Sequence, residues 1–170
     1  MSSLGDELLL SSGALLRNRL VKSAMSEQLA GRGDQPGREL LDLYRCWGAS
    51  GAAVLISGNV MVDREGISEP RQVVLDGSSS LARVRAWARA GRAGGAEFWV
   101  QLNHAGGQVP RLVKARVRGP GGSSPTRGRL LARVDPFTCG EIQGLVTKFA
   151  EAAELAVRCG FTGVQIHGAH

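Results

Sequence analysis

The chain has 170 residues, of which 43% are apolar and 21% are charged. This length is sufficient for one domain with a buried core, and the composition excludes a largely disordered chain. No apolar run approaches the roughly 20 residues that a membrane span needs. The N-terminal residues also lack the basic segment and sustained apolar run of a signal peptide. We therefore expect no membrane association.

The net charge of +6 originates in one segment. Seven of the 21 Lys and Arg residues lie between Arg111 and Arg133, where there is no acidic residue, whereas the rest of the chain has 14 basic and 15 acidic residues. A basic segment favours an anionic partner. This one contains no aromatic residue on which a base could stack. We therefore predict a solvated basic loop and no specific nucleic-acid binding.

The cysteines indicate the redox environment. Cys46, Cys139 and Cys159 are odd in number and far apart in sequence. A disulfide scaffold is not expected from such a set, and a reducing compartment fits better. We predict a cytoplasmic protein.

Four short apolar segments predict strands, and the last three are nearly continuous in apolar character, which is typical of strands buried on both faces, as in parallel sheets. They are Arg19–Ala24, Ala52–Ser57, Ala96–Leu102 and Phe161–His167. Three segments between them have apolar residues at helical spacing. These are Pro36–Ala49, Ser78–Gly91 and Thr138–Arg158, and the last begins with a capping box formed by Thr138 and Glu141.

The alternation of strands and helices predicts an α/β fold with parallel, right-handed crossovers. A doubly wound sheet and a (β/α)8 TIM-type barrel both use this order. No Gly-x-Gly-x-x-Gly turn follows any predicted strand, which disfavours a dinucleotide-binding fold. A barrel takes about 250 residues. We therefore predict a single domain, residues 1–170, that supplies the first four strands of a barrel, with a long basic Gly/Pro/Arg-rich loop at 105–137.

Polar residues gather where the predicted strands end, and barrel enzymes carry their active sites at these ends. They are Ser23 and Ser26, then Gly58 and Asn59, then Gln101, Asn103 and His104, then His167 and His170. Gln101 offers a donor and an acceptor, which match the pyrimidine edge of a flavin or a nucleobase, unless it only caps a strand. Gly168 and Ala169 let the backbone turn so that His167 and His170 face one cavity, where two imidazoles suit a developing oxyanion.

Three segments resemble the old yellow enzyme family of FMN-dependent NAD(P)H oxidoreductases. They are RNRLVKSAMS (Arg17–Ser26), QLNHAG (Gln101–Gly106) and GFTGVQIHGAH (Gly160–His170). They occur in the family's order, at the ends of the first, third and fourth predicted strands. ISGNVMVDREGIS (Ile56–Ser68) is similar to the segment after the family's second strand. The resemblance covers most of the chain from Leu16 onward.

The resemblance implies that FMN lies across the mouth of a barrel. By their position in these motifs, the flavin-lining residues are expected to be Ser23, Ala24, Met25, Ser26, Gly58 and Gln101. His167 and His170 are expected to hold the oxygen of a small electron-poor alkene, and no metal is implied. NAD(P)H would reduce FMN, and hydride would then pass to an α,β-unsaturated carbonyl.

The resemblance also implies parts that these 170 residues do not contain. They are a tyrosine acid after His170, a basic residue facing the flavin, and the loops that hold the FMN phosphate. We therefore expect weak FMN binding by these residues alone, and association with a C-terminal half-barrel or a second copy that covers the open sheet edges.

Three alternatives stay open at this point. The chain could be an inactive truncated fragment or one half of a split barrel. It could be a metal-dependent hydrolase with His104, His167 and His170 as ligands, although no Asp or Glu lies near these histidines in sequence. It could also be an anion- or nucleic-acid-binding protein that uses the basic loop.

Overall fold

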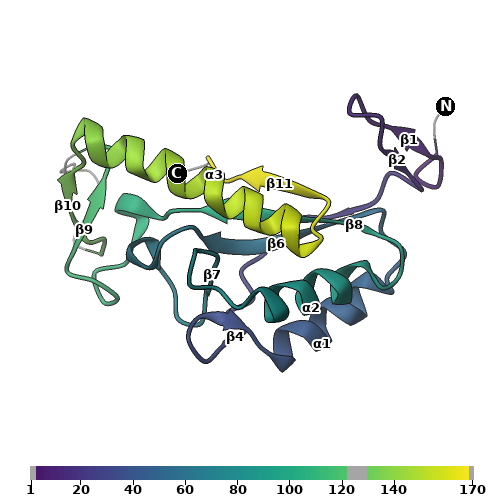
Figure 1. Cartoon of the computed structure of the whole chain (residues 1–170), viewed down its shortest axis with the longest axis horizontal. Helices are drawn as coiled ribbons and strands as arrows, with labels where there is room; N and C mark the ends of the chain where they lie inside the picture. Colours follow the sequence, from purple (N-terminus) through teal and green to yellow (C-terminus); the bar gives the residue numbers. More distant parts are fainter. Residues whose placement is uncertain (1–2, 122–129, 169–170) are drawn as a thin grey trace.

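The computed structural model describes residues 3–121 and 130–168. A parallel sheet with the strand order β11-β8-β6-β3 forms its centre (Figure 1). Its strands are β3 (Val21–Lys22), β6 (Val54–Met61), β8 (Glu97–Asn103) and β11 (Gly163–Ile166), and β7 (Val73–Val74) pairs with the end of β6. All of these pairings are parallel, as predicted.

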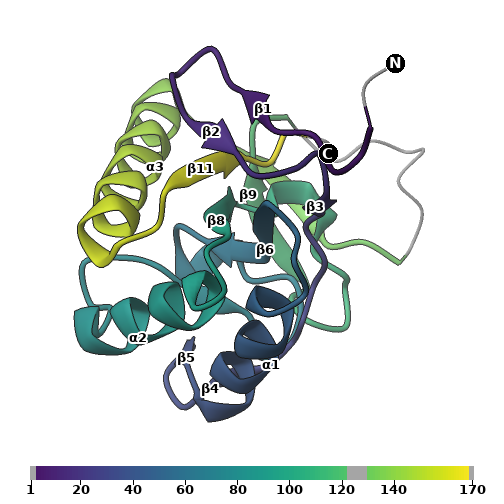
Figure 2. The same ribbon diagram turned by 90° about the vertical axis from the view of Figure 1, so that its right-hand side faces the viewer.

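Three helices form the crossovers between the strands. They are α1 (Arg38–Gly48), α2 (Leu81–Arg92) and α3 (Cys139–Cys159). The helices pack in sequence order, α1 beside α2 and α2 beside α3 (Figures 1 and 2). The predicted capping box starts α3: Thr138 Oγ1 accepts from the Glu141 N–H at 3.3 Å, and the Glu141 carboxylate accepts from the Thr138 N–H at 2.7 Å. The helix ends at Gly160, which has a φ of 96°.

An aromatic cluster forms the core between the helices and the sheet. Phe98 of β8 contacts Tyr44 of α1, Trp87 of α2 and Phe161, with ring centroids 4.7 to 5.6 Å apart. Most of these pairs are edge-on or tilted, the geometry that aromatic quadrupoles favour. Because these side chains come from α1, α2, β8 and the start of β11, their burial fixes the helices on one face of the sheet.

A second, smaller core lies on the opposite face, at the amino ends of the strands. Here β1 (Leu8–Leu9) and β2 (Leu15–Leu16) form an antiparallel hairpin that the sequence did not predict. Leu16 packs against Val54 and Ile56, with Trp99 beside them. This face, which lies opposite the helices, is called the inner face below. The hairpin covers it at the amino ends of the strands (Figure 1).

The segment predicted to be a long basic loop contains short regular elements. They are η2 (Gly106–Gln108) and the parallel strands β9 (Arg116–Gly119) and β10 (Arg133–Pro136). Their small core consists of Val109, Val117, Ala132 and Val134. Arg116 donates two 3.0 Å hydrogen bonds to Asp135, and Arg118 pairs with Glu141. Carboxylates from outside 111–133 thus neutralise part of the basic charge.

Smaller elements complete the described chain. β4 (Ala30–Gly31) and β5 (Gln35–Pro36) form a second antiparallel pair, and η1 (Arg64–Gly66) follows β6. Within residues 3–121 and 130–168, no helix is both long enough and apolar enough to span a membrane. The three cysteines are free thiols, and Cys159 is buried.

Candidate flavin and substrate site

The inner face of the sheet becomes polar toward the carboxyl ends of its strands. Side chains alternate between the two faces of a strand, so Gln101 and Asn103 follow Trp99 onto the inner face. In β11, Gly163 faces Trp99, since a Cβ at this glycine would lie 2.7 Å from Trp99 Cδ1. Gln165 is therefore also on the inner face, as is His167, and the register pairs Gln165 with Gln101.

Gln101 and Gln165 form a partly buried amide pair. Gln101 is 6% exposed, and its Nε2 donates to Gln165 Oε1 at 2.7 Å. Among the described residues, Gln101 Oε1 and Gln165 Nε2 have no hydrogen-bond partner. The pair therefore presents one acceptor and one donor side by side, and it would do so equally if both amides were rotated. This set fits the pyrimidine edge of a flavin.

Gln165 was not predicted as a site residue. The signal was present, because Gln165 lies two positions before His167, and residues two apart share a face of a strand. His167 itself extends the pairing of β11, since its backbone N–H donates to Leu102 O at 2.9 Å.

A β-bulge in β6 fixes the backbone beneath the amide pair. The pairing of β6 with β8 shifts between Ile56 and Asn59. Ser57 Oγ accepts from the Gln101 N–H at 2.9 Å and donates to Gly58 O, also at 2.9 Å. Bulges redirect side chains beside functional sites, and here the bulge brings Asn59 to the mouth of the sheet.

Gly58 was expected to let the flavin approach the second strand. The structure gives its missing side chain a different neighbour, because a Cβ there would overlap the Met25 carbonyl oxygen and the Glu27 carboxylate. Glycine is therefore required for the close approach of the loop after β3. A role of Gly58 toward the flavin itself stays a prediction.

Glu27 connects that loop to β6 and α1. Its Oε1 accepts from the Gly58 N–H at 2.8 Å and from the Tyr44 hydroxyl. Burial, reinforced by Glu27, raises the pKa of Tyr44 well above its ordinary value.

Lys22 Nζ donates to Ile56 O at 2.9 Å and lies 4.0 Å from the Trp47 ring centroid. Burial lowers the pKa of Lys22, and Glu27 opposes this shift. Sequence reasoning missed this network.

The predicted flavin-lining residues after β3 lie along the rim. Ser23 is exposed, and the Met25 side chain is 55% exposed. Ala24 packs against the small core under the hairpin. Ser26 Oγ donates to the Glu69 carboxylate. The hydroxyl proton of Ser26 is thus already engaged, and the contacts of these four residues with a flavin stay predictions.

A cavity of about 190 Å³ opens beside the amide pair. Its lining consists of Asn59, Ser68, Glu69, Asn103, His104, Ala105, Gln108 and His167. The cavity thus brings His167 together with the ends of β6 and β8. His170 lies outside the described residues, so the expected pairing of the two imidazoles stays a prediction.

His104 is packed into the wall of this cavity. Its Nδ1 accepts from the Gly106 N–H at 3.2 Å, which leaves the imidazole proton on Nε2. Gly66 makes room for the ring, because a Cβ there would lie 2.7 Å from His104 Cδ2. Burial lowers the pKa of His104, although Asp63 opposes this shift. His104 is therefore neutral near pH 7.

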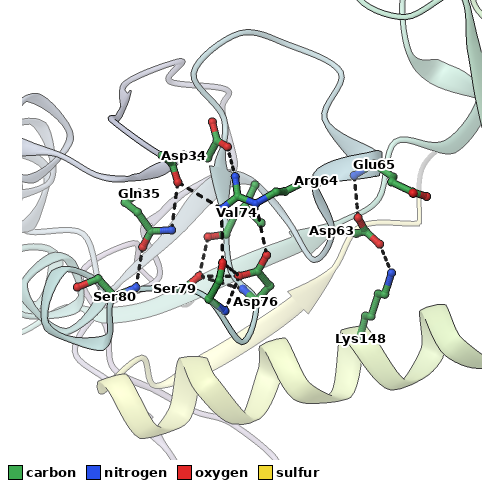
Figure 3. A network of polar contacts seen from close by, with 12 residues as sticks. Asp34, Gln35, Asp63, Arg64, Glu65, Val74, Asp76, Ser79, Ser80 and Lys148 are labelled. Atoms are coloured by element: carbon green, nitrogen blue, oxygen red, sulfur yellow. Dashed lines mark hydrogen bonds and ion pairs between the residues drawn. The ribbon is translucent and has the colours of Figure 1, made fainter.

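A polar network fixes the loops behind this wall. Figure 3 shows Lys148 of α3 paired with Asp63, which also accepts from the Glu65 N–H at 2.7 Å. Burial alone would raise the pKa of Asp63, but these two bonds outweigh it and hold the pKa below its ordinary value. Arg64 pairs with Asp34 and approaches Asp76 at 3.9 Å. The network anchors η1 and the turn before α2.

The ligand set of a metal-dependent hydrolase is not assembled in the part of the chain that the structure describes. No group of three or more His, Cys, Asp or Glu side chains in residues 3–121 and 130–168 could hold a metal ion. His170, one of the three candidate ligands, lies outside these ranges.

Comparison with known proteins decides the family. The model of the NADH:flavin oxidoreductase / NADH oxidase family matches residues 10–170. The chain belongs to this family. The NADH-dependent flavin oxidoreductase iliE of Hypocrea jecorina is 34% identical over 179 residues, covering 93% of this chain and 44% of the relative. The NADH:acrylate oxidoreductase of Vibrio harveyi is 29% identical over 175 residues, covering 100% of this chain and 17% of the relative.

Solved structures agree with the fold prediction. The old yellow enzyme homologue from Zymomonas mobilis superposes with a TM-score of 0.84 at 23% identity, covering 98% of this chain and 48% of that structure. The chain thus spans about half the length of this structure and less than half of the relatives it matches. The prediction of a partial TIM-type barrel is confirmed, as is the predicted family with its cofactors, FMN and NAD(P)H.

Proposed function

We propose that this chain forms the first half of an FMN-dependent oxidoreductase that uses NAD(P)H to reduce an electron-poor alkene, such as an α,β-unsaturated carbonyl. One observation carries the proposal. The amide pair of Gln101 and Gln165 and the cavity that contains His167 share the inner face of one sheet. A flat ring with a donor and an acceptor on one edge can bind at the amide pair. A small polarised substrate can then bind beside it, in the cavity that contains His167.

The bound FMN would supply the redox chemistry, taking hydride from NAD(P)H and delivering it to the alkene carbon. The residues of this chain orient the reactants. The free acceptor and donor of Gln101 and Gln165 hold the pyrimidine edge, and Ser57 holds the Gln101 backbone in place. His167 donates a hydrogen bond to the substrate oxygen, where negative charge develops. His170 is the second donor in this proposal.

The catalytic unit in this proposal includes a second half-barrel that covers the β11 edge. Val164 and Ile166 point away from the inner face and are 38% and 59% exposed. Ile142, Val146 and Val157 of α3 are exposed as well. More than half of the iliE relative and of the Zymomonas structure lies outside the matched region. Alternatively, a second copy of this chain covers the same apolar residues in a homo-oligomer.

Flavin loading and turnover test the proposal directly. The protein, together with the second half-barrel that the proposal requires, is purified with added FMN, and NADH or NADPH oxidation is followed without oxygen, with and without a cyclic enone. A stoichiometric yellow complex whose NAD(P)H oxidation depends on the enone supports the proposal. A colourless protein without turnover in that complete form overturns it and favours the second candidate, an inactive truncated fragment.

The proposal includes a cytoplasmic location and no specific nucleic-acid partner. Free cysteines suit a reducing cytoplasm. The pairing of Arg116 and Arg118 with carboxylates favours a structural role for the basic segment over specific nucleic-acid binding.

A further inference from the structure

The charged side chains that line the cavity beside His167 are not balanced in sign. Its lining residues include one carboxylate, that of Glu69, and no Lys or Arg. The other polar groups are amides, one hydroxyl and two imidazoles. Of these imidazoles, His104 is kept neutral by burial, which lowers its pKa.

Glu69 is held from two directions. Its Oε2 accepts from Ser26 Oγ and from Gln28 Nε2, the latter at 3.3 Å. On the other side, the backbone N–H groups of Ser68 and Glu69 both donate to Gln72 Oε1, at 2.9 and 3.1 Å. Gln72 is 3% exposed. The carboxylate is therefore fixed at the cavity wall before any ligand binds, as a specificity-determining group needs to be.

The two segments that hold Glu69 each contain an uncommon backbone conformation. Gln28 has a φ of 53° and Arg71 a φ of 55°, values that side chains other than glycine rarely adopt. Arg71 is fixed by a hydrogen bond from its Nε to Ala30 O at 3.1 Å. Such positions persist where the surroundings enforce them, and they cluster at ligand sites.

No cation neutralises Glu69 within the part of the chain that the structure describes. Its two side-chain partners are a hydroxyl and an amide, and no Lys, Arg or His forms an ion pair with it. The arginines of the neighbouring loops have other partners, because Arg71 pairs with Glu39 and Arg64 pairs with Asp34. The negative charge of Glu69 therefore acts on whatever occupies the cavity.

We propose that Glu69 makes this cavity accept neutral or cationic electron-poor alkenes and reject carboxylates. The inference rests on the proposed function only in taking the cavity as the substrate site. A substrate carboxylate that occupies this cavity of about 190 Å³ lies close to the Glu69 carboxylate, and like charges in a partly desolvated site repel. An amide or ketone of the same shape carries no such penalty and finds donors in Asn59 and Asn103.

Binding without catalysis gives the first test. Benzamide and benzoate have nearly the same shape and differ in charge, and both can be titrated into the FMN-free protein near neutral pH by calorimetry. We expect benzamide to bind at least about tenfold more tightly, and Glu69→Gln to reduce this preference to about threefold or less. The matched control is Glu65→Gln, since Glu65 is an exposed carboxylate near the same rim that does not line the cavity. The control should leave the preference unchanged.

Three results of this titration would overturn the proposal. One is an equal or greater affinity for benzoate in the unsubstituted protein. Another is a preference that survives Glu69→Gln or disappears in Glu65→Gln. The third is the absence of binding by both compounds, because the cavity would then not be a ligand site.

Turnover by the FMN-loaded protein separates this inference from the proposed function. Acrylamide and acrylate are the matched substrates, and acrylate is the substrate in the name of the Vibrio relative. We expect Glu69→Gln to raise kcat/KM for acrylate about tenfold and to change that for acrylamide less than about twofold. Reduction of both alkenes at equal rates, unaffected by Glu69→Gln, contradicts charge selection and supports the function. Reduction of neither, with the benzamide preference intact, contradicts the function and supports charge selection.

Discussion

The outer face of β8 is apolar along its whole length, whereas the inner face of this strand changes from apolar to polar toward its carboxyl end. Leu55, Phe98 and Leu102 on the outer face are fully buried under the helices. On the inner face, Trp99 is followed by Gln101 and Asn103. Alternate residues of the same strands therefore serve two purposes. Outer positions provide stability, and in the proposed function inner positions near the strand ends provide the binding groups.

This comparison predicts that substitutions on the two faces have different consequences. The expected loss of stability is largest at the centre of the outer face. It is smaller where the loop after β3 contacts β6, smaller again at the cap of α3, and smallest at a single ion pair near the rim.

Phe98→Ala should give the largest loss of stability. The ring is fully buried and contacts Tyr44, Trp87 and Phe161, so its removal leaves a cavity between the sheet and the helices that cover it. We expect the free energy of unfolding to fall by about 3–5 kcal/mol, measured by urea denaturation followed by circular dichroism. A loss below about 1 kcal/mol would show that the outer face does not provide the stability.

Gly58→Ala should lower the free energy of unfolding, because the loop after β3 lies directly against β6 at this glycine. The added methyl group overlaps the Met25 carbonyl and the Glu27 carboxylate, which forces the loop after β3 away from β6. We expect a loss of about 1–3 kcal/mol in the same assay. The matched control is Gly77→Ala, where no atom lies within 4 Å of the new Cβ, and its change should stay within about 0.5 kcal/mol. Equal effects of the two substitutions would contradict this explanation.

Thr138→Ala should cost about 1 kcal/mol by removing the capping box of α3. The hydroxyl accepts the Glu141 N–H, which is one half of the capping box. Thermal unfolding should show a small decrease in Tm. Thr138→Ser keeps the hydroxyl and should retain most of the stability, and a serine variant as unstable as the alanine variant would argue against the cap.

The smallest effect is expected at the ion pair of Asp63 and Lys148. The bonds from Lys148 and Glu65 hold the pKa of Asp63 below its ordinary value of 3.8. A lowered folded-state pKa means that the unfolded state binds more protons, so this contribution is present above the ordinary pKa and is lost as the pH falls through the folded-state pKa.

Asp63→Asn should therefore destabilise the protein near pH 7 by less than about 1 kcal/mol, because the Lys148 side chain is 48% exposed and solvent screens its charge, although the Asp63 side chain is only 12% exposed. The difference from the unsubstituted protein should shrink as the pH falls below the ordinary pKa of 3.8 in urea titrations. A difference that is constant with pH would exclude the ion pair as its cause.

Local features of the fold could be predicted from the sequence. The apolar runs in β6 and β8 and the capping box of α3 depend on neighbouring residues, and all three appear where they were predicted. The continuation of β6 from Ser57 to Met61 could not be predicted, because the strand resumes pairing with β8 only after the bulge. β9 and β10 were also missed, since each has four residues and depends on packing among Val109, Val117 and Val134.

Site residues whose positions depend on the local sequence pattern could be predicted, whereas those that depend on contacts distant in sequence could not. Gln101 and His167 end strands that were predicted, so their positions followed from the pattern. Gln165 could have been found from its spacing to His167. Glu69 gave no local signal, because it contacts Ser26 from 43 residues away. The contact exists only once β3 and β6 pair in parallel.

Binding of the flavin by the amide pair on the inner face can be measured by titrating the protein with FMN and following the quenching of flavin fluorescence. The unsubstituted protein is compared with Gln101→Leu, and the control is Gln143→Leu, which changes an exposed glutamine on α3. We expect about tenfold weaker binding in Gln101→Leu, since one buried hydrogen-bonding group is lost, and unchanged binding in the control. Equal affinities of Gln101→Leu and the unsubstituted protein would show that the amide pair does not hold the flavin.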